Sequence, residues 1–165
     1  MSVGETSKER LKDDYILMRP IGRVTSPYKD VSEIPKGLGT KHQAEGSLVI
    51  SQEFETGLKD IEGFSHLIVI WVFDRGKTYE LIGTPPSDVR PHGVFATRSP
   101  RRPNPIGLTV VELIERQGAR LCVRGIDMLD GTPILDIKPY LSNVPQEQLR
   151  RGWLAEAESR AKVKP

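Results

Sequence analysis

The sequence predicts an all-β fold, a single closed β-barrel-like domain with a short C-terminal helix. The chain has 165 residues, which is enough for one hydrophobic core and too few for two comfortable ones. From Tyr15 onward, short apolar runs of strand-like length alternate with turns that contain glycine, proline or charged residues. Helical patterns are confined to two places. Many short strands with few helices favour a closed or sandwiched β core.

Seven apolar runs are expected to form strands. In chain order they are Ile16–Val24, Ser47–Ser51, His66–Phe73, Val94–Thr97, Leu108–Ile114, Arg120–Ile126 and Ile134–Tyr140. The stretch Leu67–Phe73 is apolar on both faces, which predicts a central strand. Leu121 and Val123 alternate with more polar neighbours, as expected for a half-buried strand. Pro133 stands at the start of the last run, where its missing N–H is tolerated.

Two segments carry a helical pattern. Phe54–Ile61 is expected to form one or two turns, and a C-terminal helix is expected from Pro145 to about Ser159, with proline near its first position. Its apolar face comprises Leu149, Trp153, Leu154 and Ala157. We therefore expect a flexible N-terminal arm over residues 1–14, the barrel domain over 15–141, and the helix and tail over 142–165.

Composition indicates a globular protein with few constraints on its partner. Hydrophobic residues make up 37% and charged residues 28%, and the net charge of +2 permits an anionic partner without requiring one. Cys122 is the only cysteine, so no intrachain disulfide can form and a reducing compartment is expected. No apolar run approaches the ~20 residues that span a bilayer. These features predict a cytoplasmic protein with no membrane partner.

Several common enzyme motifs are absent from the sequence. The histidines at 42, 66 and 92 are scattered and no cysteines pair, so no metal site is expected. Neither a G-x-S-x-G elbow nor a Walker A motif is present. Gly37-Leu38-Gly39 resembles the opening of a dinucleotide-binding motif, but His42 stands where the third glycine belongs. A Rossmann-type site is therefore not expected.

The most informative segment is a stiff, basic loop between two apolar runs. This arginine loop, residues 97–105, contains three arginines, three prolines and Asn104. Proline fixes φ and removes a backbone donor, so the loop has little freedom left to lose when a ligand binds. The segment is predicted to form a preorganised binding site. A solvated, proline-rich hairpin turn is the alternative.

Two further groups of polar residues border apolar runs. Asp74 and Arg75 follow the predicted central strand, where they form either part of a site or a solvated strand end. Asp127, Asp136 and Lys138 lie in or beside apolar runs near the C-terminal end of the domain. An unpaired charge there is costly, so each is expected to have a ligand or a charge partner. Structural pairing with an arginine of the loop is the alternative to ligand binding.

With these residues in view, the chain resembles the TsaA-like (YaeB-like) family, whose best-known members are the TrmO tRNA adenosine methyltransferases. The resemblance covers most of residues 20–141. It is carried by Ile21-Gly22, Ser26-Pro27-Tyr28, Gly63-Phe64-Ser65-His66-Leu67, Gly93-Val94-Phe95-Ala96-Thr97-Arg98-Ser99, Arg102-Pro103-Asn104-Pro105-Ile106-Gly107, Asp130-Gly131-Thr132-Pro133 and Asp136-Ile137-Lys138-Pro139-Tyr140. The arginine, proline and asparagine string is the most specific of these motifs.

The resemblance implies a β-barrel methyltransferase that uses S-adenosylmethionine without a Rossmann fold. Members are usually homodimers with cofactor sites near the subunit interface. Their characterised reaction methylates the exocyclic amine of threonylcarbamoyladenosine beside the anticodon of certain tRNAs. Two alternatives stay open: a methyltransferase of the same fold that acts on a small adenosine derivative or another acceptor, and a non-catalytic module that binds an adenosyl ligand or RNA.

The resemblance also assigns site residues by position. The expected cofactor-binding residues are Lys36, Gly37, Leu38, Gly39, Asp74, Arg75, Arg98, Leu108, Ile126, Asp127, Met128 and Leu129. The expected substrate-binding residues are Arg101, Arg102, Asn104, Lys138 and Tyr140.

Two of these residues have expected roles. Arg98 is suited to a carboxylate of the cofactor or substrate, and Asp127 to ribose hydroxyls. No general base is assigned, although Asp74, Asp136, Tyr140 and solvent are candidates.

Family members often have histidine where this chain has Asp74. Bacterial members commonly carry a further small C-terminal domain, whereas this chain ends soon after the expected helix.

Basic side chains in two long loops form a candidate tRNA surface. Arg101 and Arg102 of the arginine loop are expected to face phosphates together with three lysines of the earlier loop, Lys29, Lys36 and Lys41. Simple solvation of these charges is the alternative.

Overall fold

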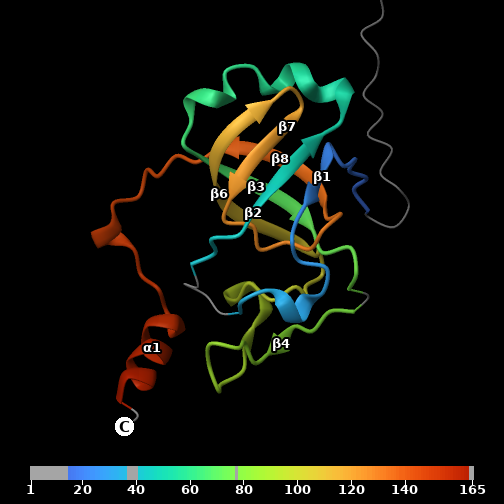
Figure 1. Cartoon of the computed structure of the whole chain (residues 1–165). Helices are drawn as coiled ribbons and strands as arrows, with labels where there is room; N and C mark the ends of the chain where they lie inside the picture. The colour runs from blue at the N-terminus through green and yellow to red at the C-terminus, as the bar shows by residue number, and fades with distance from the viewer. Residues whose placement is uncertain (1–14, 37–40, 77, 164–165) are drawn as a thin grey trace, which may run out of the picture.

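The computed structural model describes residues 15–36, 41–76 and 78–163. The expected arm over residues 1–14 and the expected cofactor residues Gly37, Leu38 and Gly39 lie outside these ranges. At the centre is a sheet built from β1 (Gly22–Thr25), β2 (Glu45–Ile50), β3 (His66–Val72), β6 (Ile106–Gln117), β7 (Arg120–Arg124) and β8 (Pro133–Pro139). The strands pair in the closed order β1-β2-β7-β6-β3-β8, and every pairing is antiparallel (Figure 1).

The ring of strands closes unevenly. Strands β3 and β6 pair over seven residues, from His66 opposite Glu112 to Val72 opposite Ile106. Strand β8 returns to β1 through only two residue pairs, one of which joins Arg23 to Pro133. The predicted all-β architecture is confirmed, and so is the central position of β3, which pairs with both β6 and β8.

The core fills the inside of the ring because side chains alternate along each strand. Every second residue of β3 is buried, and Leu67 and Val69 have no exposed surface. Full burial of one such side chain stabilises the fold by roughly 1.5 to 3 kcal/mol. The core comprises Val24, Leu48, Ile50, Leu58, Leu67, Val69, Trp71, Val111, Leu121, Val123, Ile126, Met128 and Ile134.

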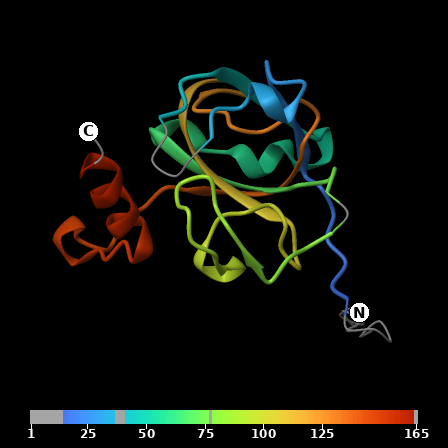
Figure 2. The same cartoon turned by 90° about the horizontal axis from the view of Figure 1, so that it is seen from below.

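Short helices and a small hairpin cover opposite ends of the barrel. At the end where β3 begins lie the 3₁₀ helices η2 (Gln52–Leu58) and η3 (Ile61–Gly63), seen at the top of Figure 1. They confirm the helical turns predicted for this region. At the other end, the chain between β3 and β6 forms β4 (Ile82–Gly83), β5 (His92–Gly93) and the 3₁₀ helix η4 (Val94–Ala96). Figure 2 shows this excursion on the face of the barrel seen from below.

Two predicted strands are wrong in whole or in part. Val94–Thr97 forms the turn η4 rather than a strand, because both the amide and the hydroxyl of Thr97 donate to the backbone oxygen of Val94, at 3.1 and 2.9 Å. Of the first predicted strand, only Gly22–Thr25 is extended and paired. Residues 15–20 are exposed, since the first ladder bond to β8 is made by Ile21.

The C-terminal helix begins later than predicted. Pro145 precedes a single 3₁₀ turn, η5 (Gln146–Gln148), and the helix α1 runs over Trp153–Val163. Gly152 interrupts the two elements with a φ of 51°, a left-handed conformation that glycine adopts at little cost. Leu149 therefore lies outside the helix. Another 3₁₀ turn, η1 (Val31–Glu33), carries a capping box between Asp30 and Glu33.

Candidate functional site

The candidate site lies at the end of the barrel where three segments with predicted site residues meet. Strand β3 leads into Asp74 and Arg75, and strand β6 follows the arginine loop. A third segment, the acidic bend of residues 125–132, connects β7 to β8. The Nη2 atom of Arg75 donates a hydrogen bond of 2.6 Å to the backbone oxygen of Asp130. The end of the central strand is thus tied directly to the acidic bend.

A buried chain of hydrogen bonds fixes Asp127 in place. The Nε1 atom of Trp71 donates to the hydroxyl of Thr109 at 3.0 Å, and that hydroxyl donates to Oδ1 of Asp127 at 2.6 Å. Trp71 lies on β3 and Thr109 on β6, and both are nearly inaccessible. Because a hydroxyl has one proton, the bond accepted from Trp71 directs it toward Asp127. Core and site are therefore connected through two neighbouring strands.

Gly107 is required by the position of the Trp71 ring. A Cβ atom at residue 107 would lie 2.2 Å from Cε2 of Trp71, closer than any real contact. The ring also packs against Phe73, with centroids 4.2 Å apart. Phe73 donates through its backbone N–H to the oxygen of Pro105 at 2.8 Å. Gly107 therefore leaves room for the Trp71 ring at the start of β6. Pro105 holds the neighbouring Phe73 through its backbone oxygen.

The electrostatic setting of Asp127 links the acidic bend to the arginine loop. Burial raises the pKa of the Asp127 carboxyl above its ordinary value, while the bond from Thr109 and the charges of His42 and Arg98 act in the opposite direction. Arg98 itself is exposed and makes no hydrogen bond or ion pair with the residues that the structure describes. The structure thus brings an unpaired guanidinium within electrostatic range of a half-buried carboxylate.

His42 joins this group, although no sequence motif indicates a role for it. Its Nδ1 atom is buried and has no hydrogen-bond partner among the described residues. His42 precedes β2, and its electrostatic effect on Asp127 opposes the rise in the pKa of that carboxyl. A lone histidine in a polar segment carries no spacing signal, so only the fold could place it here. Buried polar atoms are usually hydrogen-bonded, so this ring nitrogen has the capacity for one further polar contact.

The remaining arginines of the loop are engaged in structure. The Nη1 atom of Arg102 donates to the backbone oxygens of Thr97 and Ser99, at 3.1 and 3.0 Å. Arg101 pairs with Glu80 at 2.9 Å on the surface. Arg101 and Arg102 therefore help to fix the loop. Arg98 is the loop guanidinium without a hydrogen bond or ion pair to the described residues.

Other predicted site residues at this end are partly structural. Ile126 and Met128 have no exposed surface and belong to the core, whereas Leu129 is half-buried. Asp130 accepts from the backbone of Ser26 at 2.9 Å and pairs with Lys29 at 2.6 Å. That lysine is the main reason why the pKa of Asp130 lies below its ordinary value. The side chains of Asn104 and Lys36 are exposed.

Lys138 and Tyr140 lie toward the other end of β8. Lys138 is opposite Ile68 in the sheet, and the N–H of Tyr140 donates to the oxygen of His66, the first residue of β3. Lys138 pairs with Asp136 at 3.0 Å rather than with a loop arginine. Thr109, which bonds to Asp127, pairs with Val69 of β3, and Val69 pairs with Ile137 on its other side. Lys138 therefore lies near the level of Asp127 but on the exposed outer surface, whereas Tyr140 lies beside the start of β3.

Leu108 points outward from the barrel and belongs to an apolar patch. It lies between Ile106 and Val110 on β6, and these three side chains are 40 to 50% exposed. Their partners across the sheet are Val72, Ile70 and Ile68 of β3, all half-buried. We call this six-residue surface the outer apolar face.

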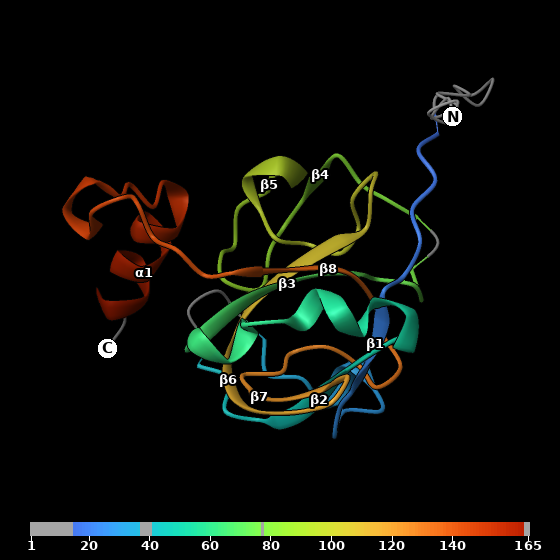
Figure 3. The same cartoon turned by 90° about the horizontal axis from the view of Figure 1, so that it is seen from above.

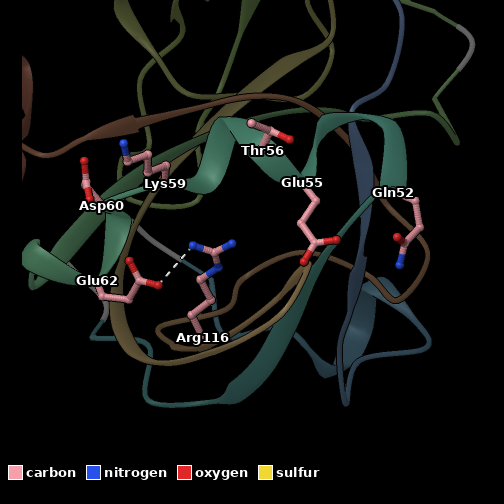
Figure 4. A pocket seen from close by; sticks show the side chains of 7 residues that line it. All are labelled: Gln52, Glu55, Thr56, Lys59, Asp60, Glu62 and Arg116. Atoms are coloured by element: carbon pink, nitrogen blue, oxygen red, sulfur yellow. Dashed lines mark hydrogen bonds and ion pairs between the residues drawn. The ribbon is translucent and has the colours of Figure 1, made fainter.

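A shallow cavity occupies the opposite end of the barrel (Figure 4). It has a volume of about 500 Å³ and is lined by Gln52, Glu55, Thr56, Lys59, Asp60, Glu62 and Arg116. Arg116 donates to the oxygens of Gly118 and Leu58, at 2.8 and 3.0 Å, and to Glu62 at 3.0 Å. Through these bonds Arg116 holds η2 and η3 against the β6–β7 hairpin. We therefore interpret the residues around this cavity as structural.

Within the described ranges, no helix is long and apolar enough to cross a membrane. The same residues contain no cluster of three or more side chains able to hold a metal ion.

The fold and the candidate site define a class of protein: a small antiparallel β-barrel with charged side chains gathered where its loops meet. The chain belongs to the TrmO family, because the family model described as the tRNA-methyltransferase O N-terminal domain matches residues 23–146.

Relatives and a solved structure agree with this assignment. A probable S-adenosyl-L-methionine-binding protein of Archaeoglobus fulgidus is 49% identical over 150 residues, covering 90% of this chain and 40% of the relative. A tRNA (adenine(37)-N6)-methyltransferase of Rattus norvegicus is 35% identical over 145 residues, covering 84% of this chain and 34% of the relative. A crystal structure of TrmO superposes with a TM-score of 0.70 and 35% identity, covering 84% of this chain and 64% of that one. The chain thus spans less than two thirds of each of these proteins.

Proposed function

We propose that this chain is an S-adenosylmethionine-dependent methyltransferase that acts on the exocyclic amine of adenosine beside the anticodon of tRNA. Threonylcarbamoyladenosine is the proposed form of that nucleoside. Family membership and the printed activity of the rat relative support the reaction class. The observation that carries the proposal is Asp127, whose half-buried carboxyl is held by Thr109 at 2.6 Å within electrostatic range of Arg98 and His42. We propose 15–141 as the domain that holds the site.

The residues present fit S-adenosylmethionine. The cofactor combines a carboxylate with ribose hydroxyls and an adenine ring. Arg98 offers a guanidinium that can bind the carboxylate bidentately, and Asp127 offers a carboxylate for the hydroxyls. The buried Nδ1 of His42 lacks a partner among the described residues, which suits a polar atom of the adenosine. We propose the half-buried Leu129 and the loop residues 36–39 as further cofactor contacts, with Ile126 and Met128 supporting the acidic bend from the core.

Catalysis at such a site depends mainly on alignment. When bound, S-adenosylmethionine supplies a methyl group on a positively charged sulfur, ready for in-line displacement. The rigid arginine loop and the fixed Asp127 hold donor and acceptor in one orientation, which lowers the entropic part of the barrier. We propose that Asn104, which is exposed, contacts the acceptor base. The methylated amine then loses one proton.

Two of the candidates for accepting that proton have contacts away from the arginine loop. Asp136 pairs with Lys138, and the N–H of Tyr140 donates to His66 at the start of β3. Asp74 is exposed, 3.9 Å from Arg75, at the correct end of the barrel. We therefore propose Asp74 or solvent as the proton acceptor.

A homodimer is part of the proposal. The outer apolar face is flanked by charged pairs, Asp136 with Lys138 on one side and Glu112 with Arg124 on the other. An apolar centre with a polar rim is typical of protein interfaces. Leu108 lies on this face and Lys138 at its edge, so a partner subunit seated there would bring both predicted site residues to an interface.

A methyl-transfer assay tests the proposed function. The chain is incubated with S-adenosylmethionine labelled in its methyl group and with tRNA that either contains or lacks threonylcarbamoyladenosine. We expect label only in the modified nucleoside of the first tRNA. Label in both tRNAs would exclude the threonylcarbamoyl requirement. Stabilisation by the cofactor in a thermal-shift experiment without transfer to tRNA would favour a different acceptor or a non-catalytic binding module.

The proposed cellular setting follows from the same reaction. A tRNA partner and a single, unpaired cysteine both fit the cytoplasm. Of the basic residues expected to face phosphates, Lys29, Arg101 and Arg102 already have structural partners. We therefore propose a modest electrostatic contribution to tRNA binding, with a shallow dependence on salt.

A further inference from the structure

The C-terminal helix is held on the excursion that leads into the arginine loop. Figure 3 shows α1 to one side of the barrel, joined to β8 by a long connection. Residues 140–152 of that connection are all exposed, so they contribute little packing. The position of α1 therefore depends on contacts made by the helix itself.

The first contact is a hydrogen bond to the backbone just before the loop. The Nε1 atom of Trp153 donates to the oxygen of Ala96 at 2.8 Å. Ala96 is the last residue of η4, two positions before Arg98. The indole ring of Trp153 also stacks on His92, with centroids 4.3 Å apart and an angle of 16° between the planes. One side chain of α1 thus contacts both ends of the segment 92–96.

The second contact is made through a buried carboxylate. Asp88 has only 2% of its side chain exposed, and its Oδ2 atom lies 2.7 Å from Nε2 of His92. Its Oδ1 atom accepts from Arg160 at 2.7 Å and from the backbone of Val89 at 2.8 Å. Both oxygens are therefore used. The bond with His92, and after it those with Val89 and Arg160, keeps the pKa of Asp88 far below its ordinary value.

These contacts come from one face of the helix. Trp153, Ala157 and Arg160 are spaced four and three residues apart, which places them in one line along α1. Ala157 is 7% exposed, and it is the one buried residue of the helix. Trp153, Ala157 and Arg160 thus form the face of α1 that is turned toward the chain between β3 and β6. On that chain, Asp88, His92 and Ala96 receive the contacts.

The segment that receives the helix continues directly into the ligand loop. Thr97 closes η4 on Val94, and its hydroxyl accepts from the N–H of Ser99 at 3.3 Å. The backbone between these bonds carries Arg98. A displacement of Ala96 would therefore move the one loop guanidinium that lacks a partner among the described residues.

We propose that α1 is a clamp that positions Arg98 for ligand binding, with Trp153, Asp88, His92 and Arg160 as positioning residues. The proposal rests on the proposed function, because it assigns Arg98 to the cofactor or substrate. The helix contacts no ligand in this account. It raises the fraction of molecules in which the loop has its binding conformation, and the apparent dissociation constant changes with that fraction.

Two measurements on full-length Trp153→Ala test the clamp. Hydrogen exchange of residues 94–102 is expected to accelerate about fivefold or more, because one neutral hydrogen bond changes an equilibrium by about that factor. Exchange in β3 and β6 is expected to stay unchanged. Calorimetry with S-adenosylmethionine, or with tRNA if the loop serves the substrate, is expected to show at least threefold weaker binding. Unchanged exchange in residues 94–102, or faster exchange with unchanged affinity for both ligands, would overturn the proposal.

Matched variants separate positioning from general loss of structure. Trp153→Phe keeps a ring for stacking on His92 but lacks the donor to Ala96, so its effect is expected to lie between those of wild type and Trp153→Ala. Arg160→Gln breaks the bond to Asp88, whereas Arg151→Gln breaks only the pair with Glu158 inside the same C-terminal segment. Only Arg160→Gln is expected to accelerate exchange in residues 94–102. Equal effects of the two glutamine variants would contradict a specific clamp.

The outcome for the clamp can be distinguished from the outcome for the proposed reaction. If the wild type binds S-adenosylmethionine but transfers no methyl group to tRNA, the proposed reaction is wrong, while exchange and affinity still decide the clamp. If the wild type transfers methyl groups and the Trp153 variants match it in exchange and affinity, the clamp is wrong and the reaction stands.

Discussion

Gly107→Ala is predicted to disturb both the core and the site, although it adds only one methyl group. The new Cβ would lie 2.2, 2.4 and 2.6 Å from three atoms of the Trp71 indole. The ring cannot move outward freely, because Trp71 is 6% exposed and packs on Phe73. Either the ring turns or strand β6 shifts away from β3. Both changes lengthen the 3.0 Å bond from Trp71 to Thr109 that supports Asp127.

The size of the effect follows from two contributions. Overpacking of a tight core costs about 1 to 3 kcal/mol, and loss of one buried hydrogen bond costs about 1 kcal/mol more. We therefore expect the free energy of unfolding to fall by about 2 to 4 kcal/mol. The bond from Thr109 to Asp127 depends on the same ring, so binding of S-adenosylmethionine is expected to weaken as well.

Urea denaturation followed by far-UV circular dichroism measures this change. Gly57→Ala is the matched control, because a Cβ at residue 57 would meet no atom within 4 Å. The control is expected to change stability by less than about 0.5 kcal/mol, as surface substitutions usually do. If Gly107→Ala is as stable as the control, the Trp71 ring is not confined by Gly107. The account of the hydrogen bonds from Trp71 through Thr109 to Asp127 would then be wrong.

Three further predictions concern the ligand site and the outer apolar face. Arg98→Ala is expected to weaken binding of the cofactor or the substrate at least tenfold in calorimetry, and unchanged affinity for both would remove its assignment. Asp127→Asn is expected to gain stability relative to wild type as pH rises above the ordinary aspartate value of 3.8, because the pKa of Asp127 is raised in the folded chain and the folded state therefore binds more protons than the unfolded one. Denaturation midpoints of both proteins across acidic pH measure this difference, and parallel curves would refute it. Leu108→Asp is expected to convert a dimer into a folded monomer in light scattering, whereas Val49→Asp, at an exposed position on β2, is expected to leave the mass unchanged.

Much of the architecture could be predicted because local signals and tertiary structure agree. The doubly apolar run at 67–73 becomes the central strand, since one side of it packs in the core and the other forms part of the outer apolar face. The arginine loop is rigid for the predicted reason, its prolines, and for a second one that the sequence does not display. Arg102 satisfies two carbonyls of its own loop, which depends on how the chain folds back.

The errors arise where tertiary contacts decide the local structure. Val94–Thr97 has strand-forming residues, but the hydroxyl of Thr97 closes a turn on Val94. Proline favours a first turn and so predicts a helix from Pro145, yet that turn ends at Gln148 and α1 begins at Trp153, after the left-handed Gly152. In both cases one polar or flexible residue outweighs the propensity of its neighbours.

The candidate site was only partly visible in the sequence for a similar reason. Arg98 and Asp127 carry recognisable motifs, whereas His42 and Thr109 reach the site through strands that are adjacent only in the folded barrel. Thr109, the partner of Asp127, lies across Val69 from Ile137, so Lys138 lies near the same level of the barrel as Asp127 but on its exposed outer surface. Spacing along the chain therefore could not distinguish a site residue from a residue on the outer surface.

A crystal structure of the chain with S-adenosylmethionine tests the central claim most directly. The account predicts the cofactor at the end of the barrel formed by the arginine loop and the acidic bend, with its carboxylate at Arg98 and its ribose at Asp127. Cofactor bound instead in the cavity beside Arg116, or at a position that touches neither Arg98 nor Asp127, would contradict it.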